Sequence, residues 1–551
     1  MSKSEKDYIV EAHQFMQTQE YHQALDMIYQ GIQNYNTSYE LYFMLAQCKE
    51  LLNCIEQAAV SYQNALFFSA DEDYEEIERE YAGFLGEYSK RVHSVSIILV
   101  TYNQLEYTKL CVESIRQNNP GGSYEIIVVD NFSTDGTREW ISGQKDIKVI
   151  LNDENVGFPA ACNQGAENAE EGNDIFLLNN DTILLRNSLY NLRMALYEKE
   201  ETGAVGACSN MVGNWQMISE RYDFLEDYAS YADRNNAYDP SRHGIRLYLS
   251  GFALLCKRDA WKSAGGMDVD YHVGMFDDTD FGFRLLSKGF YSVLCRDSFI
   301  YHFGSVSFRS TFTEEQNDHL MDTNRQIFEK KWGITSDYFG NIRMELVKMI
   351  NMPHDKKFSV LEIGCGLGST LLEIKGLYPD ASLYGLELDE KAVEFAGNYA
   401  GMMSVIQGNI EEGENPFGIQ YDYIIFADVL EHLNWPDKTL KETMKWLKPN
   451  GAFLLSIPNI CHISVLLPLL RGNFTYTDAG ILDRTHLRFF TWNEIRKFLD
   501  SLGLKVVDLL ATVTKTSVYE EEYINRLVAF DEKITKEELQ AYQYIIKAVR
   551  E

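Results

Sequence analysis

The sequence predicts a multidomain α/β protein, in which an all-helical N-terminal segment precedes two separate parallel sheets. Three observations support this prediction. The chain has 551 residues, which is too long for a single hydrophobic core, because domains hold roughly 100–200 residues each. Residues 1–90 have a helical pattern throughout. The remainder contains two series of short apolar runs separated by helix-length polar segments, a βαβ rhythm typical of parallel sheets.

Residues 1–90 also contain an internal repeat. Three pairs of residues are separated by 34 positions: Tyr8 and Tyr42, Ala12 and Ala46, and Ala24 and Ala58. Small residues where helices cross, with aromatic residues beside them, resemble tetratricopeptide repeats, whose period is about 34. The resemblance implies a surface for a protein partner. An amphipathic bundle without a binding role remains the alternative.

The first series of apolar runs predicts a domain over residues 94–340. Nearly unbroken apolar runs of this length are typical of strands buried on both faces. The runs are SVSIILV (94–100), EIIVVD (125–130), IKVIL (147–151) and DIFLLNND (174–181).

Polar side chains follow three of these strands, where open α/β sheets bind their ligands. The strand-end residues are Thr101, Tyr102 and Asn103, then Asp130, then Asn179, Asn180 and Asp181. A carboxylate at such an end can accept a base N–H or hold a metal. Each alone could equally form a turn or a helix cap. All three ends together, in this order, indicate a ligand site.

The first domain resembles family 2 glycosyltransferases of the GT-A fold (the nucleotide-diphospho-sugar transferase fold) from about Ser94 to Gly333. The matching pieces are VTYNQ (100–104), VVDNFSTDGT (128–137), ENVGFPAACNQG (154–165), LLNNDT (177–182), GFALLCKRDAW (251–261), GGMD (265–268), FDDTDFGFR (276–284) and IYHFGSVS (300–307).

This resemblance implies a UDP- or dTDP-sugar donor and a divalent metal, Mn²⁺ or Mg²⁺. Asp130 is implied to contact the uracil ring. The usual D-x-D motif is here Asn179-Asn180-Asp181, so Asp181 is the expected metal ligand and His302 its partner. The nucleotide-sugar-binding residues implied are Thr101, Tyr102, Asn103, Asp130, Asn155, Gly157, Asn163, Asn180 and Asp181.

The chemistry of sugar transfer needs a cation and a base. Negative charge builds on the departing nucleoside diphosphate, and a metal offsets it. A carboxylate within hydrogen-bond reach removes the acceptor's proton. The family places this base in an acidic pair, here Asp277-Asp278, and we expect Asp278 to serve, with Asp280 a weaker candidate. A single displacement with one base implies inversion. A solvated acidic turn is the alternative.

The second series of runs predicts a domain over residues 345–515. The runs are FSVLEIG (358–364), SLYGLEL (382–388), MMSVIQGN (402–409), YDYIIFAD (421–428) and GAFLLSIP (451–458). A G-x-G-x-G loop follows the first strand, and glycines there let the backbone approach a ligand closely. Glu387 ends the next strand, where a carboxylate can bind both ribose hydroxyls.

This domain resembles the class I methyltransferases, a Rossmann-like fold that uses S-adenosylmethionine, from about Phe358 to Val513. The cofactor-binding residues implied are Glu362, Gly364, Gly366 and Gly368 at the methionine end, Glu387 at the ribose, and Asn409 and Ile410 at the adenine. Asp428 is implied to close the site near the donor methyl. The segment GILDRTHLRFFT (480–491) resembles small-substrate methyltransferases often attached to surface-sugar enzymes. The base is unassigned, because His432, His462 and His486 are each candidates that could equally be structural.

Charge and composition limit the partners. A net charge of −32 repels nucleic acid and anionic membranes, so we expect no nucleic-acid partner and a local cation for any phosphate-bearing ligand. No apolar run approaches the roughly 20 residues of a membrane span, and the N-terminus lacks a signal-peptide pattern. Nine cysteines without a C-x-x-C pair indicate reduced thiols. We expect a cytoplasmic protein with no transmembrane segment; peripheral attachment at the inner membrane face stays open.

The whole sequence therefore predicts a bifunctional enzyme that adds a sugar to a surface polysaccharide and methylates a sugar or nearby hydroxyl. One alternative is a glycosyltransferase whose repeats grip a protein acceptor such as flagellin. Another is an assembly protein with one or both catalytic folds inactive, which the intact Asp181, Asp278 and Glu387 weigh against. Residues 516–551 are expected to form an acidic helical tail without chemistry of its own.

Overall fold

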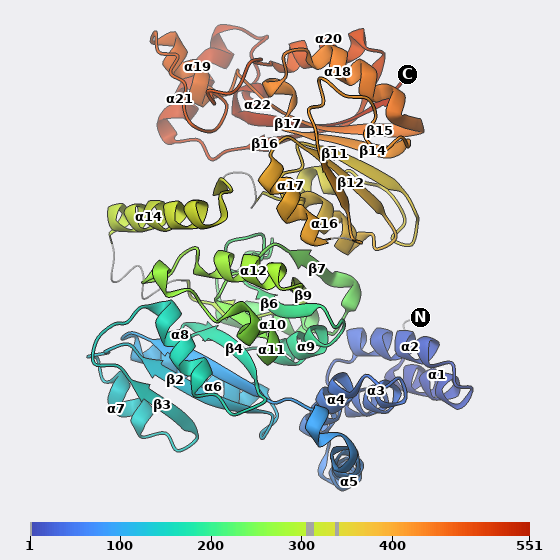
Figure 1. The fold of residues 1–551 in the computed structure, drawn as a ribbon, viewed down its shortest axis with the longest axis vertical. Coiled ribbons are helices and arrows are strands. Elements are labelled where there is room, and N and C mark those ends of the chain that lie inside the picture. Colours follow the sequence, from blue (N-terminus) through green and yellow to red (C-terminus); the bar gives the residue numbers. More distant parts are fainter. Residues whose placement is uncertain (1–2, 305–312, 337–340, 400) are drawn as a thin grey trace. The chain divides into compact units, whose positions relative to one another are not determined.

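The computed structural model describes residues 3–304, 313–336, 341–399 and 401–551, with the side chains of residues 71 and 72 also left out. It forms two compact units, Met1–Ser336 and Asp337–Glu551 (Figure 1). The helical repeats share the first unit with the first sheet, and the second sheet lies in the second unit. The expected boundary at residue 340 and residues 305–307 of the IYHFGSVS motif lie outside the described residues. No described helix has both the length and the apolar character needed to cross a bilayer.

Five helices form the N-terminal segment. They are α1 (Glu5–Gln17), α2 (Tyr21–Asn34), α3 (Tyr39–Leu51), α4 (Ile55–Phe68) and α5 (Asp71–Tyr88). All six residues of the 34-residue repeat are buried, with no more than 8% of any side chain exposed. A Cβ on Gly31 would lie 2.9 Å from Leu41, so a small residue lets α2 approach α3 closely. These are the packing positions expected of helical repeats.

The repeats pack on the first sheet's domain through α4 and the buried helix α9 (Ser188–Leu196). The Gln57 side-chain amide donates to the Met194 carbonyl at 2.8 Å. The Asn187 amide donates to the Asn36 carbonyl at 2.9 Å. This face of the repeats is therefore covered by the first sheet's domain.

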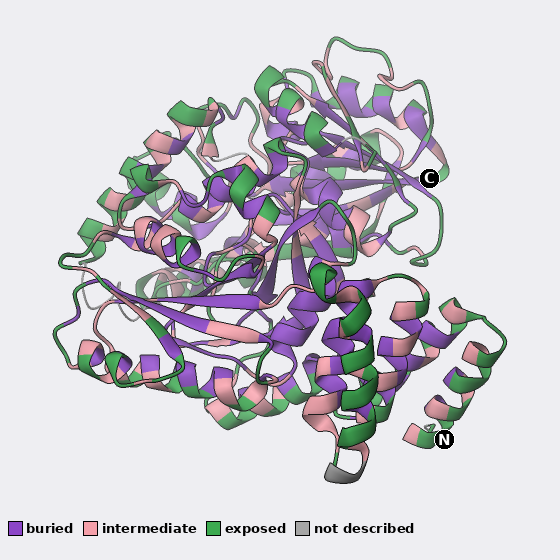
Figure 2. Ribbon diagram, turned by 60° about the horizontal axis from the view of Figure 1, so that its bottom comes forward, coloured by how far each residue is buried: buried purple, intermediate pink, exposed green. Residues whose placement is uncertain are grey.

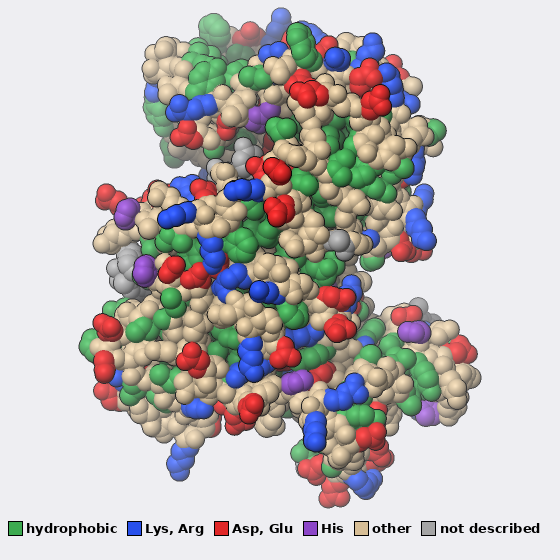
Figure 3. Space-filling view, in the orientation of Figure 1, with side chains coloured by type: hydrophobic (Ala, Val, Ile, Leu, Met, Phe, Trp, Pro, Cys, Tyr) green, Lys and Arg blue, Asp and Glu red, His purple; other side chains and the backbone are tan. Residues whose placement is uncertain are grey.

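Acidic side chains gather on the outer face of α5, the lowest element on the right in Figures 1 and 3. Glu75, Glu76, Glu78 and Glu80 are all exposed there. Such a face suits neither nucleic acid nor an anionic membrane.

The first sheet has eight strands in the order β3-β2-β1-β4-β8-β6-β9-β7. The strands are β1 (Val95–Thr101), β2 (Tyr124–Asp130), β3 (Ile147–Leu151), β4 (Asp174–Asn179), β6 (Thr202–Cys208), β7 (His243–Arg246), β8 (Ala253–Cys256) and β9 (Tyr291–Phe299). The four expected runs form the parallel half of the sheet, and β8 is antiparallel to β4 and β6. A hydrophobic cluster covers each face, and Figure 2 shows the strands buried between helices with exposed outer faces.

The other elements of the first unit surround this sheet. A two-stranded ribbon joins β5 (Thr182–Ile183) to β10 (Tyr301–His302). The helices are α6 (Leu105–Asn118), α7 (Thr137–Ser142), α8 (Phe158–Glu167), α10 (Leu225–Asn235), α11 (Arg258–Ala264), α12 (Asp277–Ser287) and α14 (Glu314–Trp332).

The second sheet has seven strands in the order β13-β12-β11-β14-β15-β17-β16. They are β11 (Ser359–Ile363), β12 (Ser382–Glu387), β13 (Ser404–Gln407), β14 (Tyr421–Ala427), β15 (Leu447–Pro458), β16 (Leu504–Val513) and β17 (Ala541–Arg550). The five expected runs are parallel, and β17 is antiparallel to both its neighbours. The helices are α15 (Met344–Lys348), α16 (Ser369–Leu377), α17 (Glu390–Ala396), α18 (Pro436–Thr443), α19 (Ile463–Leu470), α20 (Trp492–Ser501), α21 (Val518–Phe530) and α22 (Lys536–Gln540).

The C-terminal segment differs from the expected separate tail of residues 516–551. Helices α21 and α22 are present, but residues 541–550 form β17, which lies inside the sheet between β15 and β16. Ile545 and Ile546 are at most 1% exposed because sheet neighbours and helices enclose them. The acidic composition of residues 519–540 concealed the apolar run that follows it. The methyltransferase-like fold therefore extends to the last residues.

Candidate functional site

The polar ends of three neighbouring strands meet at one edge of the first sheet. Thr101 lies opposite Asp130 in the register of β1 against β2, and Val100 lies opposite Asn179 in that of β1 against β4. Asp181 follows β4 by two residues. The edge that the sequence predicted for ligand binding therefore brings these side chains to one end of parallel strands.

Asp130 is fully buried at this edge and held by two hydrogen bonds and one ion pair. The Thr101 hydroxyl donates to Oδ1 at 3.1 Å and the Ser133 backbone N–H donates to Oδ2 at 3.0 Å. The Arg138 guanidinium lies 3.4 Å from Oδ2. These contacts orient the carboxylate at the strand end before any ligand arrives.

The loop after β1 is tied to the loop after β2. Asn103 has a positive φ of 57°, its Oδ1 accepts the Thr134 N–H at 2.8 Å, and its own N–H donates to Ser133 Oγ at 2.7 Å. Tyr102 is half-buried beside it. Phe132 is 48% exposed, so an aromatic face is available on the rim near Asp130.

Asp181 and His302 form a buried pair, with His302 Nε2 3.2 Å from Asp181 Oδ1. Nδ1 of His302 lies 2.7 Å from the Met211 carbonyl. A carbonyl only accepts, so Nδ1 donates to it and the ring is held with Nε2 toward the Asp181 carboxylate and the Asn179 side-chain amide, which lies 3.4 Å away. An imidazole nitrogen and a carboxylate held side by side in this way are ligand types that suit a divalent cation. Asn180 instead donates to Thr108 at 3.0 Å.

The acidic pair lies at the N-terminus of α12. Asp278 is half-buried, and its carboxylate accepts the N–H groups of Gly251 at 3.1 Å and Thr279 at 2.7 Å. Asp277 is 4% exposed, and burial together with the neighbouring Asp278 charge raises its pKa to about 8. Burial also raises the pKa of Asp278. Asp280 is committed to ion pairs with Arg284 and Lys331, each at 2.7 Å. Asp278 is thus the accessible member.

The remaining predicted residues of this site support its loops. A Cβ on Gly157 would lie 1.9 Å from the His272 carbonyl oxygen, so glycine lets the loop before α8 touch the loop before α12. Asn155 accepts the Gly157 N–H at 3.0 Å. Asn163 both donates to and accepts from the Met267 backbone at 2.8 Å. These three residues position loops, and their contact with a nucleotide sugar stays a prediction.

The glycine loop of the second sheet has the conformation that its spacing predicted. Gly364, Gly366 and Gly368 all have positive φ values, of 66°, 53° and 83°. The Gly366 N–H donates to Glu387 Oε2 at 2.8 Å, while Glu387 Oε1 accepts the Leu388 N–H at 2.7 Å. The loop and the end of β12 are therefore joined where the cofactor's ribose is expected.

Glu362 and a nearby pocket complete the expected cofactor site. Glu362 is 3% exposed, its Oε2 has no hydrogen-bond partner among the described residues, and burial raises its pKa to about 8. A pocket opens beyond the ends of β12 and β13. Its lining includes Leu386, Ile406, Gly408, Asn409, Ile410 and Pro416. Asn409 and Ile410 thus line a pocket, and their contact with an adenine stays a prediction.

Asp428 has a positive φ of 53° and contacts three elements. The Ser456 hydroxyl donates to it at 2.7 Å, Arg343 forms an ion pair with it, and the Gln543 amide donates to it. Sequence analysis missed both Arg343 and Gln543. Arg343 precedes the first strand of the domain, and Gln543 lies in the segment taken for a tail. Only the apolar run around Gln543 offered a signal.

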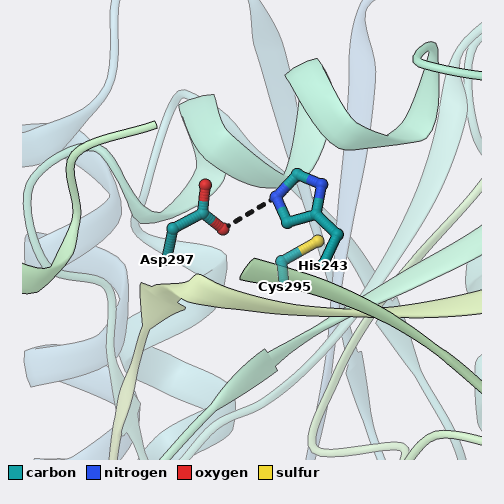
Figure 4. A group of neighbouring side chains, drawn as sticks. All are labelled: His243, Cys295 and Asp297. Carbon is teal, nitrogen blue, oxygen red and sulfur yellow. Dashed lines mark hydrogen bonds and ion pairs between the residues drawn. The ribbon is translucent and has the colours of Figure 1, made fainter. Parts of the chain in front are cut away.

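A buried cluster of His243, Cys295 and Asp297 has the residue types of a metal site (Figure 4). The ring nitrogens of His243 each lie 3.0 Å from a carboxylate, of Asp297 and of Glu198. Burial disfavours the charged ring, but these two carboxylates outweigh it and raise the pKa of His243 to about 10. A doubly protonated imidazolium has no lone pair for a metal. The cluster therefore serves the structure of β7 and β9.

Comparisons with known proteins agree with this division. Residues 96–260 match the family described as glycosyl transferase family 2, and residues 336–509 match a methyltransferase domain family. The chain is 33% identical to malonyl-[acyl-carrier protein] O-methyltransferase of Halalkalibacterium halodurans over 107 residues, 18% of this chain and 40% of that one. It is 35% identical to glycosyltransferase AglE of Haloferax volcanii over 80 residues, 14% and 26% of the two chains. It is 23% identical to a mitochondrial ubiquinone biosynthesis O-methyltransferase of Candida albicans over 175 residues, which are 31% of this chain and 54% of that one.

The chain thus spans well under two thirds of these relatives. Similar solved structures include GalNAc-T7 with UDP, GalNAc and Mn²⁺, at 15% identity and a TM-score of 0.32 over 38% of this chain and 44% of that one. A mannosyltransferase of Pyrobaculum calidifontis with GDP-Man and Mn²⁺ has 19% identity and a TM-score of 0.29 over 45% and 68%.

Proposed function

We propose that this chain, which joins a glycosyl transferase family 2 domain to a methyltransferase domain, is a bifunctional enzyme. One site transfers a sugar from a UDP- or dTDP-sugar to a hydroxyl of a surface glycan. The other uses S-adenosylmethionine to methylate the sugar on oxygen. The observation that carries this proposal is the gathering of Asp130, Asp181 and Asp278 in one unit while the other holds the glycine loop and Glu387.

The residues of the first site fit a divalent metal. Asp181 and His302 would hold it, because the ring is fixed by the Met211 carbonyl and faces the carboxylate at 3.2 Å. The ion, Mn²⁺ or Mg²⁺, supplies positive charge for the departing nucleoside diphosphate. Asp130 is oriented to accept an N–H from a uracil or thymine ring, which is why we propose a UDP or dTDP donor.

Asp278 is the proposed general base. It is accessible, and two backbone N–H groups hold its carboxylate in one orientation. A carboxylate so placed removes the acceptor proton as the hydroxyl attacks. Since no second carboxylate of the acidic pair is accessible to form a covalent intermediate, we propose a single displacement with inversion.

The residues of the second site fit S-adenosylmethionine. Glu387 has both oxygens oriented by backbone N–H groups and would accept the ribose hydroxyls. Asn409 and Ile410 would flank the adenine in their pocket, and Asp428 would close the methionine end. The cofactor supplies an electrophilic methyl group. Holding both sites on one chain keeps the product of one near the other through the tether alone.

A screen of nucleotide sugars with the purified full-length chain tests this proposal. We expect hydrolysis of one UDP- or dTDP-sugar in Mn²⁺ or Mg²⁺, and binding of S-adenosylmethionine in the same preparation. GDP-sugars serve as the control for the base contact at Asp130. Turnover of GDP-sugars alone would contradict the assigned base contact, and no S-adenosylmethionine binding would favour the assembly alternative.

A further inference from the structure

Three side chains in the second unit converge without an assigned role. They are Glu431 and His432, at the short 3₁₀ helix Leu430–His432, and His486 from the GILDRTHLRFFT segment. One ring nitrogen of each histidine and one carboxylate oxygen all lie within 4.8 Å of one another. The two rings pack edge to face, with centroids 4.7 Å apart.

The cluster adjoins the proposed methyl-donor site. Glu431 follows Asp428 by three residues on the loop after β14. Between them, Val429 lies so close to the glycine loop that a Cβ on Gly364 would meet it at 2.9 Å. The segment that carries Glu431 and His432 therefore packs on the glycine loop, at the carboxyl edge of the sheet where folds of this type bind their ligands.

The Nδ1 atom of each histidine is committed to a backbone carbonyl. His486 Nδ1 lies 2.9 Å from the Ile481 carbonyl, and His432 Nδ1 lies 3.3 Å from the Thr485 carbonyl and 3.1 Å from its hydroxyl. Because carbonyls only accept, Nδ1 donates in each ring, which leaves Nε2 as the ring atom that can bind a metal. This is how proteins orient histidine ligands for metals.

Glu431 provides the independent observation. Its side chain is 1% exposed, and neither carboxylate oxygen has a hydrogen-bond partner within the part of the chain that the structure describes. Buried carboxylates are almost always paired, since an unpartnered one costs free energy. Arg343 exerts an attractive charge on Glu431 without forming a hydrogen bond to it. A bound cation would supply the partner that this buried carboxyl group lacks.

The contrast with His243 excludes an ordinary structural pair. There, carboxylates saturate both ring nitrogens. Here, one ring nitrogen of each histidine and a carboxylate oxygen of Glu431 converge, and neither Glu431 oxygen has a hydrogen-bond partner among the described residues. A histidine acting as a base would need only one ring and would leave Glu431 unexplained.

We propose that Glu431, His432 and His486 form a binding site for a divalent first-row transition-metal ion, and that the ion binds the hydroxyl of the methyl acceptor. Two imidazoles and one carboxylate suit Zn²⁺, Mn²⁺, Fe²⁺, Co²⁺ or Ni²⁺ better than Mg²⁺ or Ca²⁺. Three protein ligands leave positions open, as catalytic sites do. The second half of this proposal rests on the proposed methyltransferase function.

A cation here would lower the pKa of the acceptor hydroxyl. The hydroxyl proton leaves to water, an oxygen lone pair forms the bond to the methyl carbon, and the carbon–sulfur bond breaks with its electron pair remaining on sulfur. The products are the methyl ether and S-adenosylhomocysteine. No base side chain is then needed, which fits the absence of one at Asp428, whose carboxylate is held by Ser456 and Arg343.

The test measures metal binding directly on the full-length chain. Asp181→Ala provides a background without the other candidate ion site. Zn²⁺ binding is titrated by calorimetry, and Co²⁺ is added separately to record its visible ligand-field spectrum. In this background we expect about one ion per chain with a Kd below about 100 μM. Glu431→Gln and His486→Ala should each weaken it by about 100-fold, and His462→Ala, whose ring caps α19, should not.

As a control for folding, S-adenosylmethionine binding by Glu431→Gln is measured. Wild-type affinity there shows that a loss of metal binding in this variant does not come from misfolding. The metal site is overturned if the Asp181→Ala chain binds no ion below that Kd, or if Glu431→Gln retains the wild-type Co²⁺ spectrum. A chain that binds the ion but no S-adenosylmethionine would contradict the methyltransferase function and leave the metal site standing.

Discussion

The acidic side chains at the carboxyl edges of the two sheets are satisfied in different ways. In the first sheet, Asp130 has two hydrogen bonds and one ion pair, and Asp181 faces His302. In the second, one oxygen of Glu362 and both oxygens of Glu431 have no hydrogen-bond partner among the residues described. At the first edge these carboxylates have partners within the chain, and so do Glu387 and Asp428 at the second, whereas Glu362 and Glu431 keep buried oxygens without one among the described residues. Since unpartnered buried carboxylates cost free energy, ligands should stabilise the second unit more than the first.

The largest effect expected concerns the first edge. Asp181→Ala should reduce donor turnover to background, because His302 alone leaves the ion with one protein ligand. Excess chelator should do the same to the wild-type chain. Asp259→Ala is the control, because this exposed aspartate lies on α11, after the end of β8 that pairs with the start of β4. Turnover is measured as nucleoside diphosphate release. Full activity in excess chelator would contradict the proposal that sugar transfer needs a metal.

Next in size is the effect of Asp278→Asn. The amide keeps the shape of the side chain but cannot accept the acceptor's proton, so transfer should fall by about 10²- to 10⁴-fold. Nucleotide-sugar affinity should stay nearly unchanged. Rate and calorimetry are compared on one preparation. Wild-type turnover would assign the base role to Asp277 or Asp280.

The second sheet can be disrupted from β17, which lies between β15 and β16. Ile546→Asp places an unpaired carboxylate in a fully buried position of β17 and should destabilise the second unit by about 3 kcal/mol or more. Val518→Asp, at a 90% exposed position on α21, should have little effect. Thermal unfolding and S-adenosylmethionine binding report the change. An Ile546→Asp chain with wild-type cofactor affinity would mean that β17 is dispensable.

A smaller effect on stability is expected when the pH is raised, because His243 of the first unit loses its charge-dependent contacts with Asp297 and Glu198. Its pKa of about 10 lies above its unfolded value of about 6.5. The stabilisation is therefore complete below pH 6.5 and is lost as the pH rises toward 10. The difference in melting temperature between wild type and His243→Gln should shrink over this range. A difference independent of pH would mean that the ring is neutral.

The sequence predicted those parts of the fold that local patterns encode. The apolar runs located β1 to β4 and β11 to β14, and the G-x-G-x-G spacing located the loop after β11, whose glycines have positive φ values. The 34-residue offset located the buried crossings of α1 to α4. Each of these signals is contained within about 35 residues, so periodicity and spacing suffice.

The rest depends on contacts between distant segments. Gln543 reaches Asp428 from 115 positions away, and β17 joins the sheet after two acidic helices. His486 meets His432 only through the fold of the segment that carries it. The candidate histidines could be named from sequence, but their tautomers and the unpartnered Glu431 depend on tertiary structure.

The central claim, two separate sites on one chain, is tested most directly by calorimetry with both ligands. The full-length chain is titrated with the nucleotide sugar and with S-adenosylmethionine, each alone and each in the presence of the other, and Glu387→Ala is titrated in parallel. The contacts of Glu387 lie within the second unit. Its loss should therefore weaken S-adenosylmethionine binding by about 10- to 100-fold and leave nucleotide-sugar affinity unchanged. Loss of both affinities in a chain that still melts cooperatively, or no S-adenosylmethionine binding by the wild type, would contradict the account.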